Sequence, residues 1–129
     1  LRASWVGGWS AIREYPAEKV TWPLVFDGKT HDKNYLREVS VDPWKPWIEA
    51  GGSVHIGEMG CHNYTPHATV LAWLDDLLSV FAEQNWGWSL WNLSGSFGIM
   101  DSGRKDVKYE DYKGHKLDRQ MLEILKKHL

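Results

Sequence analysis

The clearest hydrophobic pattern in the chain predicts a helix that opens at Thr65-Pro66 and runs to about residue 81. Threonine is a favoured helix cap, and proline is tolerated at the first helical position. Apolar residues then recur at the i, i+3/i+4 and i+7 spacing that places them along one face of a helix. These residues are Val70, Leu71, Leu74, Leu77, Leu78 and Phe81. Such a stripe needs another element to pack against.

Short apolar runs on either side of this helix predict two strands, over residues 53–59 and 87–91. A run of four to eight apolar residues bounded by turn signals is typical of a buried parallel strand. A last helix is expected over residues 116–127, with Leu117, Met121, Ile124 and Leu125 facing inward. The alternation of helix and strand predicts an α/β chain whose parallel strands are joined by right-handed crossovers.

The N-terminal third has weaker patterns. Residues 1–14 are expected to form an irregular aromatic loop, and residues 20–26 are β-prone. Pro23 argues against a central strand there, because proline cannot donate a ladder hydrogen bond. Asp27-Gly28 is typical of a turn. Two short helices should precede the first parallel strand, over residues 34–41 and from Asp42-Pro43 to Gly51-Gly52.

Composition narrows the class of protein. The chain has 129 residues, which suits one domain, and its 43% hydrophobic and 25% charged content is globular. A net charge of -2 gives no reason to expect nucleic acid, one cysteine excludes an intrachain disulfide, and no apolar run could span a membrane. The chain begins at Leu1 without a signal-like segment, which is consistent with a processed, truncated or engineered chain.

One carboxylate stands out at the end of the first predicted parallel strand. Glu58 follows Val54 and Ile56 and lies between Gly57 and Gly60. The carboxyl end of such a strand is where an α/β barrel places its catalytic groups. Alternatively, Glu58 caps the next helix or pairs with an arginine. From these residues alone, both interpretations stand equally.

Several motifs that follow Glu58 carry a family resemblance. They are the stretch from Gly60 to His67, Trp86-Gly87-Trp88-Ser89-Leu90-Trp91-Asn92, the stretch from Gly95 to Arg104, and the segments Asp106-Val107, Tyr109-Glu110-Asp111 and 114–119. Together they resemble the C-terminal part of glycoside hydrolase family five, the cellulase-like retaining (β/α)8 barrels. The match extends from about Trp44 to Leu129 and is vague before that.

The resemblance implies a partial (β/α)8 barrel with about the last two to three βα units, parallel strands and packed helices. Residues 1–129 would form one domain, loop-rich over 1–43 and built of βα units over 44–129. The implied activity is retaining, endoglucanase-like hydrolysis of β-linked glucan, with Glu58 as nucleophile and Trp91 stacking on sugar. Asn92 and Ser94 could bind sugar hydroxyls. His55 joins the candidate substrate-binding residues, although it can also hydrogen-bond within the strand layer.

The chain also departs from the family. A complete barrel needs about 200 to 250 residues or more, and the Asn-Glu-Pro signature of the acid/base on strand four is absent. The loop carboxylates Glu14, Glu110 and Asp111 are expected to be solvated or structural. Asp101 and Arg104 are expected to pair and hold the loop after the last strand. The rival interpretations are therefore a carbohydrate-binding remnant without the acid/base, and a purely structural fragment.

Metal and thiol chemistry are weaker alternatives. His55, Cys61, His62 and His67 fit no trusted zinc spacing, so we expect neither a metal nor another cofactor. Cys61 lacks an obvious base with its orienting group, which a thiol nucleophile requires. If the substrate is polymeric, a secreted or periplasmic location is expected.

Association is the last expectation. Two or three parallel strands leave unpaired edges and one poorly covered face. We therefore expect a homo-oligomer, or a complementary barrel fragment, to cover them.

Overall fold

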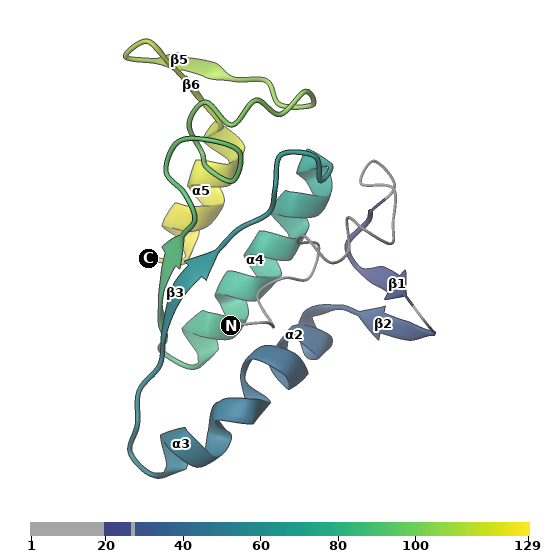
Figure 1. Ribbon diagram of the computed structural model, residues 1–129, viewed down its shortest axis with the longest axis vertical. Coiled ribbons are helices and arrows are strands. Elements are labelled where there is room, and N and C mark those ends of the chain that lie inside the picture. Colours follow the sequence, from purple (N-terminus) through teal and green to yellow (C-terminus); the bar gives the residue numbers. More distant parts are fainter. Residues whose placement is uncertain (1–19, 27) are drawn as a thin grey trace.

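The computed structural model describes residues 20–26 and 28–129, and the expected aromatic loop over residues 1–14 lies outside them. Over the described residues the chain forms short helices and strands around one long helix (Figure 1). In chain order these are β1 Leu24–Phe26, β2 Lys29–His31, α2 Lys33–Ser40, the 3-10 helix η3 Asp42–Trp44, α3 Lys45–Glu49, β3 His55–Met59, α4 His67–Glu83, β4 Gly87–Leu90, β5 Glu110–Tyr112, β6 His115–Leu117 and α5 Arg119–Lys127.

The central layer is the parallel pair β3–β4, as the order of elements predicts. Helix α4 connects the two strands, and α5 follows β4 after the β5–β6 hairpin. The described chain is thus a mixed α/β fold with two parallel strands and packed helices. Within residues 20–26 and 28–129, β3 and β4 each pair with only one other strand.

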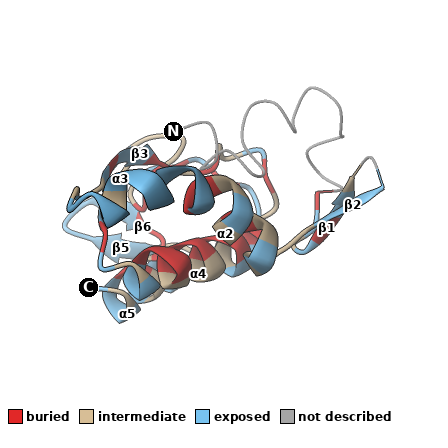
Figure 2. Cartoon of the chain, turned by 90° about the horizontal axis from the view of Figure 1, so that it is seen from below, coloured by how far each residue is buried: buried red, intermediate tan, exposed pale blue. Residues whose placement is uncertain are grey.

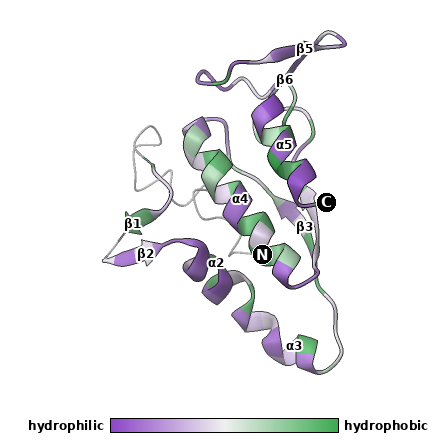
Figure 3. Ribbon diagram, turned by 180° about the vertical axis from the view of Figure 1, so that it is seen from behind, coloured by the Kyte–Doolittle hydropathy of each residue, from purple (hydrophilic) through white to green (hydrophobic). Residues whose placement is uncertain are grey.

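The core lies around α4 (Figure 2). Figure 3 shows hydrophobic positions along this helix and mostly hydrophilic residues along α2. The predicted stripe is confirmed for Val70, Leu74, Leu77, Leu78 and Phe81, whose side chains are inaccessible to solvent. Burying one such side chain stabilises a fold by about 1.5–3 kcal/mol, so α4 contributes much of the driving force for folding.

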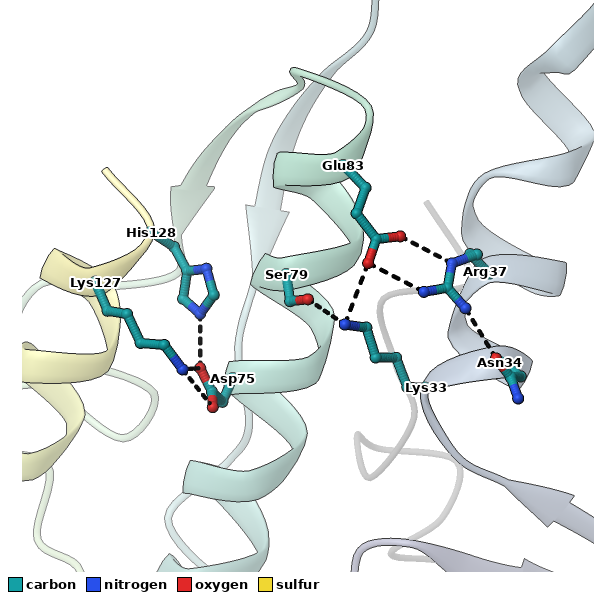
Figure 4. A network of polar contacts seen from close by, with 8 residues as sticks. All are labelled: Lys33, Asn34, Arg37, Asp75, Ser79, Glu83, Lys127 and His128. Atoms are coloured by element: carbon teal, nitrogen blue, oxygen red, sulfur yellow. Dashed lines mark hydrogen bonds and ion pairs between the residues drawn. The ribbon is translucent and has the colours of Figure 1, made fainter.

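Two flanking helices are joined to α4 by polar contacts (Figure 4). On one side Arg37 of α2 donates two hydrogen bonds to Glu83, at 2.9 and 3.0 Å, and Lys33 lies 3.2 Å from the same carboxylate. The Arg37 hydrogen bonds, aided by Lys33, lower the pKa of Glu83 to about 2. On the other side Lys127 and His128 contact Asp75. These pairs are partly exposed, so they orient the helices more than they stabilise them.

The start of α4 differs from the expectation. Thr65 does not cap the helix; Pro66 occupies the cap position, without a capping side chain. The backbone N–H of His67 instead donates to the Asp106 carboxylate at 2.6 Å. A carboxylate is favourable at the positive end of a helix dipole. The cap therefore comes from a distant loop.

The two antiparallel hairpins also refine the predictions. The β-prone segment before Gly28 is strand β1, which pairs with β2, and Asp27 of the predicted turn lies outside the described residues. The loop after β4 contains an unexpected hairpin, β5–β6. As a result the last helix begins at Arg119 rather than near Lys116. Leu117 is still buried, but it reaches the core from β6.

Candidate functional site

Glu58 and Trp91 lie at the same end of the parallel pair. Glu58 is the penultimate residue of β3, and Trp91 directly follows β4. The backbone N–H of Trp91 donates to the Met59 carbonyl at 2.7 Å, which ties the two strand ends together. Glu58 is exposed, and 52% of Trp91 is accessible to solvent. The structure thus brings the predicted nucleophile and the predicted sugar platform to the same exposed end of the strand pair.

A β-bulge sets the orientation of Glu58. Ile56 pairs with Trp88 and Met59 pairs with Leu90, so β3 takes three steps where β4 takes two. The extra residue falls at Gly57–Glu58, and both of these residues are exposed. In a regular strand successive side chains alternate between faces, and a bulge re-aims one of them. The bulge keeps Glu58 on the open side while Met59 enters the core.

Neither alternative role of Glu58 is seen. Within residues 20–26 and 28–129, no arginine pairs with Glu58, and the α4 N-terminus is capped by Asp106 instead. An exposed carboxylate without a bound cation remains available as an acceptor or a nucleophile.

The segment after Trp91 packs closely against the end of β3. The Trp91–Asn92 peptide bond is cis. A Cβ added at Gly60 would lie 2.5 Å from the Trp91 carbonyl oxygen, so only glycine fits there. Asn92 is half-buried, and its Oδ1 has no hydrogen-bond partner among the described residues. Ser94 donates to Asp101 at 3.4 Å.

His55 lies at the other end of β3. Its Nε2 is 3.2 Å from Ser89 Oγ, so it hydrogen-bonds within the strand layer. With a rise of about 3.3 Å per residue, it stands roughly 10 Å along the strand from Glu58. The structure does not bring His55 to the edge occupied by Glu58 and Trp91.

Arg104 is a buried residue that joins the loops after β3 and β4. It is 3% exposed, and its guanidinium donates to the carbonyls of Cys61 at 2.7 Å, Thr65 at 2.9 Å and His62 at 3.3 Å. The expected Asp101–Arg104 pair is therefore wrong. The buried guanidinium needs partners inside the protein, and three backbone carbonyls supply them for Nη1 and Nη2, whereas Nε has no partner among the described residues.

Asp101 serves the β5–β6 hairpin instead. It accepts hydrogen bonds from the Lys116 backbone N–H at 2.9 Å and from His115 Nδ1 at 2.7 Å. The Lys116 and His115 hydrogen bonds lower the pKa of the Asp101 carboxyl. Asp101 thus ties the β5–β6 hairpin to the loop after β4, but through His115 and Lys116 rather than through Arg104.

Further polar contacts make the two loops one unit. Asn63 donates to the Ser102 carbonyl at 2.7 Å. The Tyr109 hydroxyl accepts from the Arg104 backbone N–H at 2.7 Å and lies 2.8 Å from Ser102 Oγ. Sequence reasoning identified neither Arg104 nor Tyr109 in this role. Only their place in the family-like motifs marked these two residues as candidates. The local sequence pattern does not show which groups their side chains contact.

The histidines and the cysteine go to separate partners. His67 Nε2 lies 2.7 Å from Asp118, which is buried and also caps α5 through the Met121 N–H. Cys61 is buried, and burial raises the pKa of its thiol to about 12. No group of three metal-ligating side chains is found in the described part of the chain. None of the helices formed by these residues is long and apolar enough to cross a membrane.

The candidate second carboxylates have other surroundings. Glu110 accepts a hydrogen bond from Arg119 at 2.6 Å, which fits the expected structural role. Asp111 is exposed on β5 opposite Lys116. Glu14 lies outside the described residues.

No protein family model and no curated protein matches the chain. Among solved structures, one described as a glycoside hydrolase is 42% identical, with a TM-score of 0.77 over 85% of this chain and 34% of its own. The cellulose synthase subunit Z of Clostridioides difficile is 22% identical, with a TM-score of 0.62 over 84% of this chain and 31% of its own. Endoglucanase Cel5A of Thermotoga maritima is 19% identical, with a TM-score of 0.62 over 83% and 30%.

Two further structures of the Thermotoga protein, each 18% identical, are complexes with cellobiose and with mannotriose. The resemblance to part of a glycoside hydrolase that the motifs indicated is thereby confirmed. The chain spans about a third of the length of these solved structures.

Proposed function

We propose that this chain supplies the nucleophile portion of a retaining β-glycoside hydrolase of the family-five type. The observation that carries the proposal is the exposed Glu58 carboxylate, set on a bulge at a strand end beside the exposed face of Trp91. The 42% identity to a glycoside hydrolase supports the same assignment.

In the proposed reaction a Glu58 oxygen attacks the anomeric carbon of the sugar. The bond to the leaving-group oxygen breaks, and an acid protonates that oxygen. Water, deprotonated by the same group, then attacks the glycosyl ester and releases Glu58 with retention. Trp91 would stack on the sugar next to the bond that breaks, because an aromatic face matches the C–H face of a pyranose.

The proposed substrates are β-linked glucans and related oligosaccharides. This proposal follows the motifs and the neighbouring Thermotoga protein, whose complexes hold cellobiose and mannotriose.

The acid would come from another part of an assembled barrel. Retaining enzymes need two carboxyl groups about 5–5.5 Å apart, and Glu110 is engaged by Arg119. Strands β3 and β4 have free outer edges within the described residues, where further strands can pair. We propose that a second copy or a complementary barrel fragment fills them. Sedimentation across a wide concentration range tests the second copy, and a folded monomer at low concentration would refute it.

Labelling with a mechanism-based inhibitor tests the nucleophile. A 2-deoxy-2-fluoro-β-cellobioside with a dinitrophenyl leaving group needs no acid, because dinitrophenolate leaves unprotonated. The label should therefore form even without the second carboxyl group. Peptide mapping should find the sugar on Glu58. A label on another carboxylate, or none, would contradict the proposal.

Two variants control this experiment. Glu58→Gln should abolish labelling, whereas Glu49→Gln, an exposed glutamate at the end of α3, should label like the unmodified chain.

The second candidate function is carbohydrate binding without hydrolysis. It is favoured by the 52% exposure of Trp91 together with the missing acid/base motif. In that case cello-oligosaccharides would bind equally well to the unmodified chain and to Glu58→Gln, and no label would form.

A further inference from the structure

A cluster of aromatic rings borders the open edge beyond Trp91. His62 and Tyr64 come from the loop after β3, and Phe97 comes from the loop after β4. The His62 ring lies 4.6 Å from the Tyr64 ring and 5.2 Å from the Phe97 ring, both in edge-to-face geometry. Tyr64 is 69% exposed despite this packing. The cluster thus presents a large aromatic face to solvent.

Gly60 connects this cluster to the site. A Cβ on Gly60 would lie 2.5 Å from the Trp91 carbonyl and 3.4 Å from Phe97. The Phe97 ring and the Trp91 backbone therefore flank the same residue, two positions after Glu58. Through Gly60 the aromatic cluster adjoins the strand end that carries Glu58 and Trp91.

His62 gives the cluster a polar group of defined character. Its Nδ1 accepts a hydrogen bond from the Tyr64 backbone N–H at 3.4 Å. This contact leaves the proton on Nε2, which can donate to a hydroxyl. Burial, with the nearby Arg104 charge, lowers the pKa of His62. The lowered pKa favours the uncharged ring, which donates from Nε2.

The loop that carries His62 and Tyr64 is held in place. Arg104 donates to the carbonyls of His62 and Cys61, and Asn63, between His62 and Tyr64 in the sequence, donates to the Ser102 carbonyl. A ligand that stacks on Tyr64 would therefore pay little to order the loop. Tyr64 is not part of the hydrophobic core, so core packing does not explain a tyrosine at this position.

We propose that Tyr64, His62 and Phe97 form a second sugar-binding position beside Trp91. The ligand is a pyranose unit of a β-linked oligosaccharide that stacks on Tyr64 and accepts a hydrogen bond from His62 Nε2. The proposal rests on the function proposed above, since Trp91 would hold the neighbouring part of the same oligosaccharide.

Calorimetric titration of the 129-residue chain with cellotetraose tests the proposal. Tyr64→Ala should weaken binding at least about fivefold, the lower end of what one aromatic stacking partner contributes. Tyr64→Phe keeps the ring and should bind like the unmodified chain. Trp44→Ala removes an exposed aromatic residue of η3, before the opposite end of β3, and should also leave binding unchanged.

A Trp91→Ala variant separates this inference from the proposed function. Weak binding by Trp91→Ala together with unchanged binding by Tyr64→Ala would overturn the second position and leave the proposed function intact. Absence of cellotetraose binding by the unmodified chain would overturn both. A circular dichroism spectrum like that of the unmodified chain would show that each variant is folded.

Discussion

The two faces of the β3–β4 layer differ in what they contact. One face is closed by α4, and Ile56, Met59 and Leu74 are buried there. The other side exposes Gly57, Glu58 and half of Trp91. The closed face holds nearly all of the packing, whereas the open one holds the candidate chemistry. The described chain therefore keeps its own core on one face and leaves the candidate site residues exposed on the other.

Glu58→Gln, on the exposed face, is expected to have the largest effect, which is a loss of activity. In the assembled barrel, reducing-sugar release from soluble β-glucan is expected to fall by about 10³-fold or more, because the amide cannot act as the nucleophile. The free energy of unfolding, measured in urea, should change by no more than about 0.5 kcal/mol, since the residue is exposed. Equal activity in the variant would remove Glu58 from the mechanism.

Cys61 tests the difference in exposure between two residues that are close in sequence, Glu58 and Cys61. It stands three positions after Glu58 but is buried, and burial raises the pKa of its thiol to about 12. Because the thiolate is the reactive form, iodoacetamide at pH 8 should modify Cys61 only after the chain is unfolded in urea. Mass spectrometry of the two reactions gives the result. Rapid modification of the folded chain would mean that Cys61 is accessible.

Leu74→Ala should disrupt the packing of the closed face against α4. Truncating this fully buried leucine is expected to destabilise the chain by about 2–5 kcal/mol, through lost burial and a residual cavity. Urea unfolding measures the change. Leu93→Ala is the matched control, because Leu93 is 64% exposed and its loss should cost about 0.5 kcal/mol or less. Similar losses for both leucines would contradict the assignment of the core.

Glu83→Gln should have the smallest effect. Since Glu83 is 38% exposed, its pairs with Arg37 and Lys33 are expected to contribute less than about 1 kcal/mol. Its folded pKa of about 2 lies below the unfolded value of about 4.3, so the contribution is present above the unfolded value. The stability difference between the two chains should therefore shrink as pH falls from 5 to 2. A constant difference would mean that the charge is not responsible.

The sequence predicted what depends on local pattern. The periodic leucines located α4, and the short apolar runs located β3 and β4 in parallel. It did not predict the cap of α4, because Asp106 reaches His67 across 39 positions of the chain. The Asp101–Arg104 pair failed for the same reason, as residues close in sequence found distant partners. The bulge at Gly57–Glu58 was also beyond reach, because it depends on the register of two strands.

The buried Arg104 guanidinium has a consequence for exchanging parts between proteins. It fastens the segment from Cys61 to Thr65 to a loop more than thirty positions later, at three separate carbonyls. Grafting either loop alone from another protein would leave this cation without its acceptors or the carbonyls without their donor. The two loops therefore need to be exchanged together, and a library that varies specificity should recombine them as a single cassette.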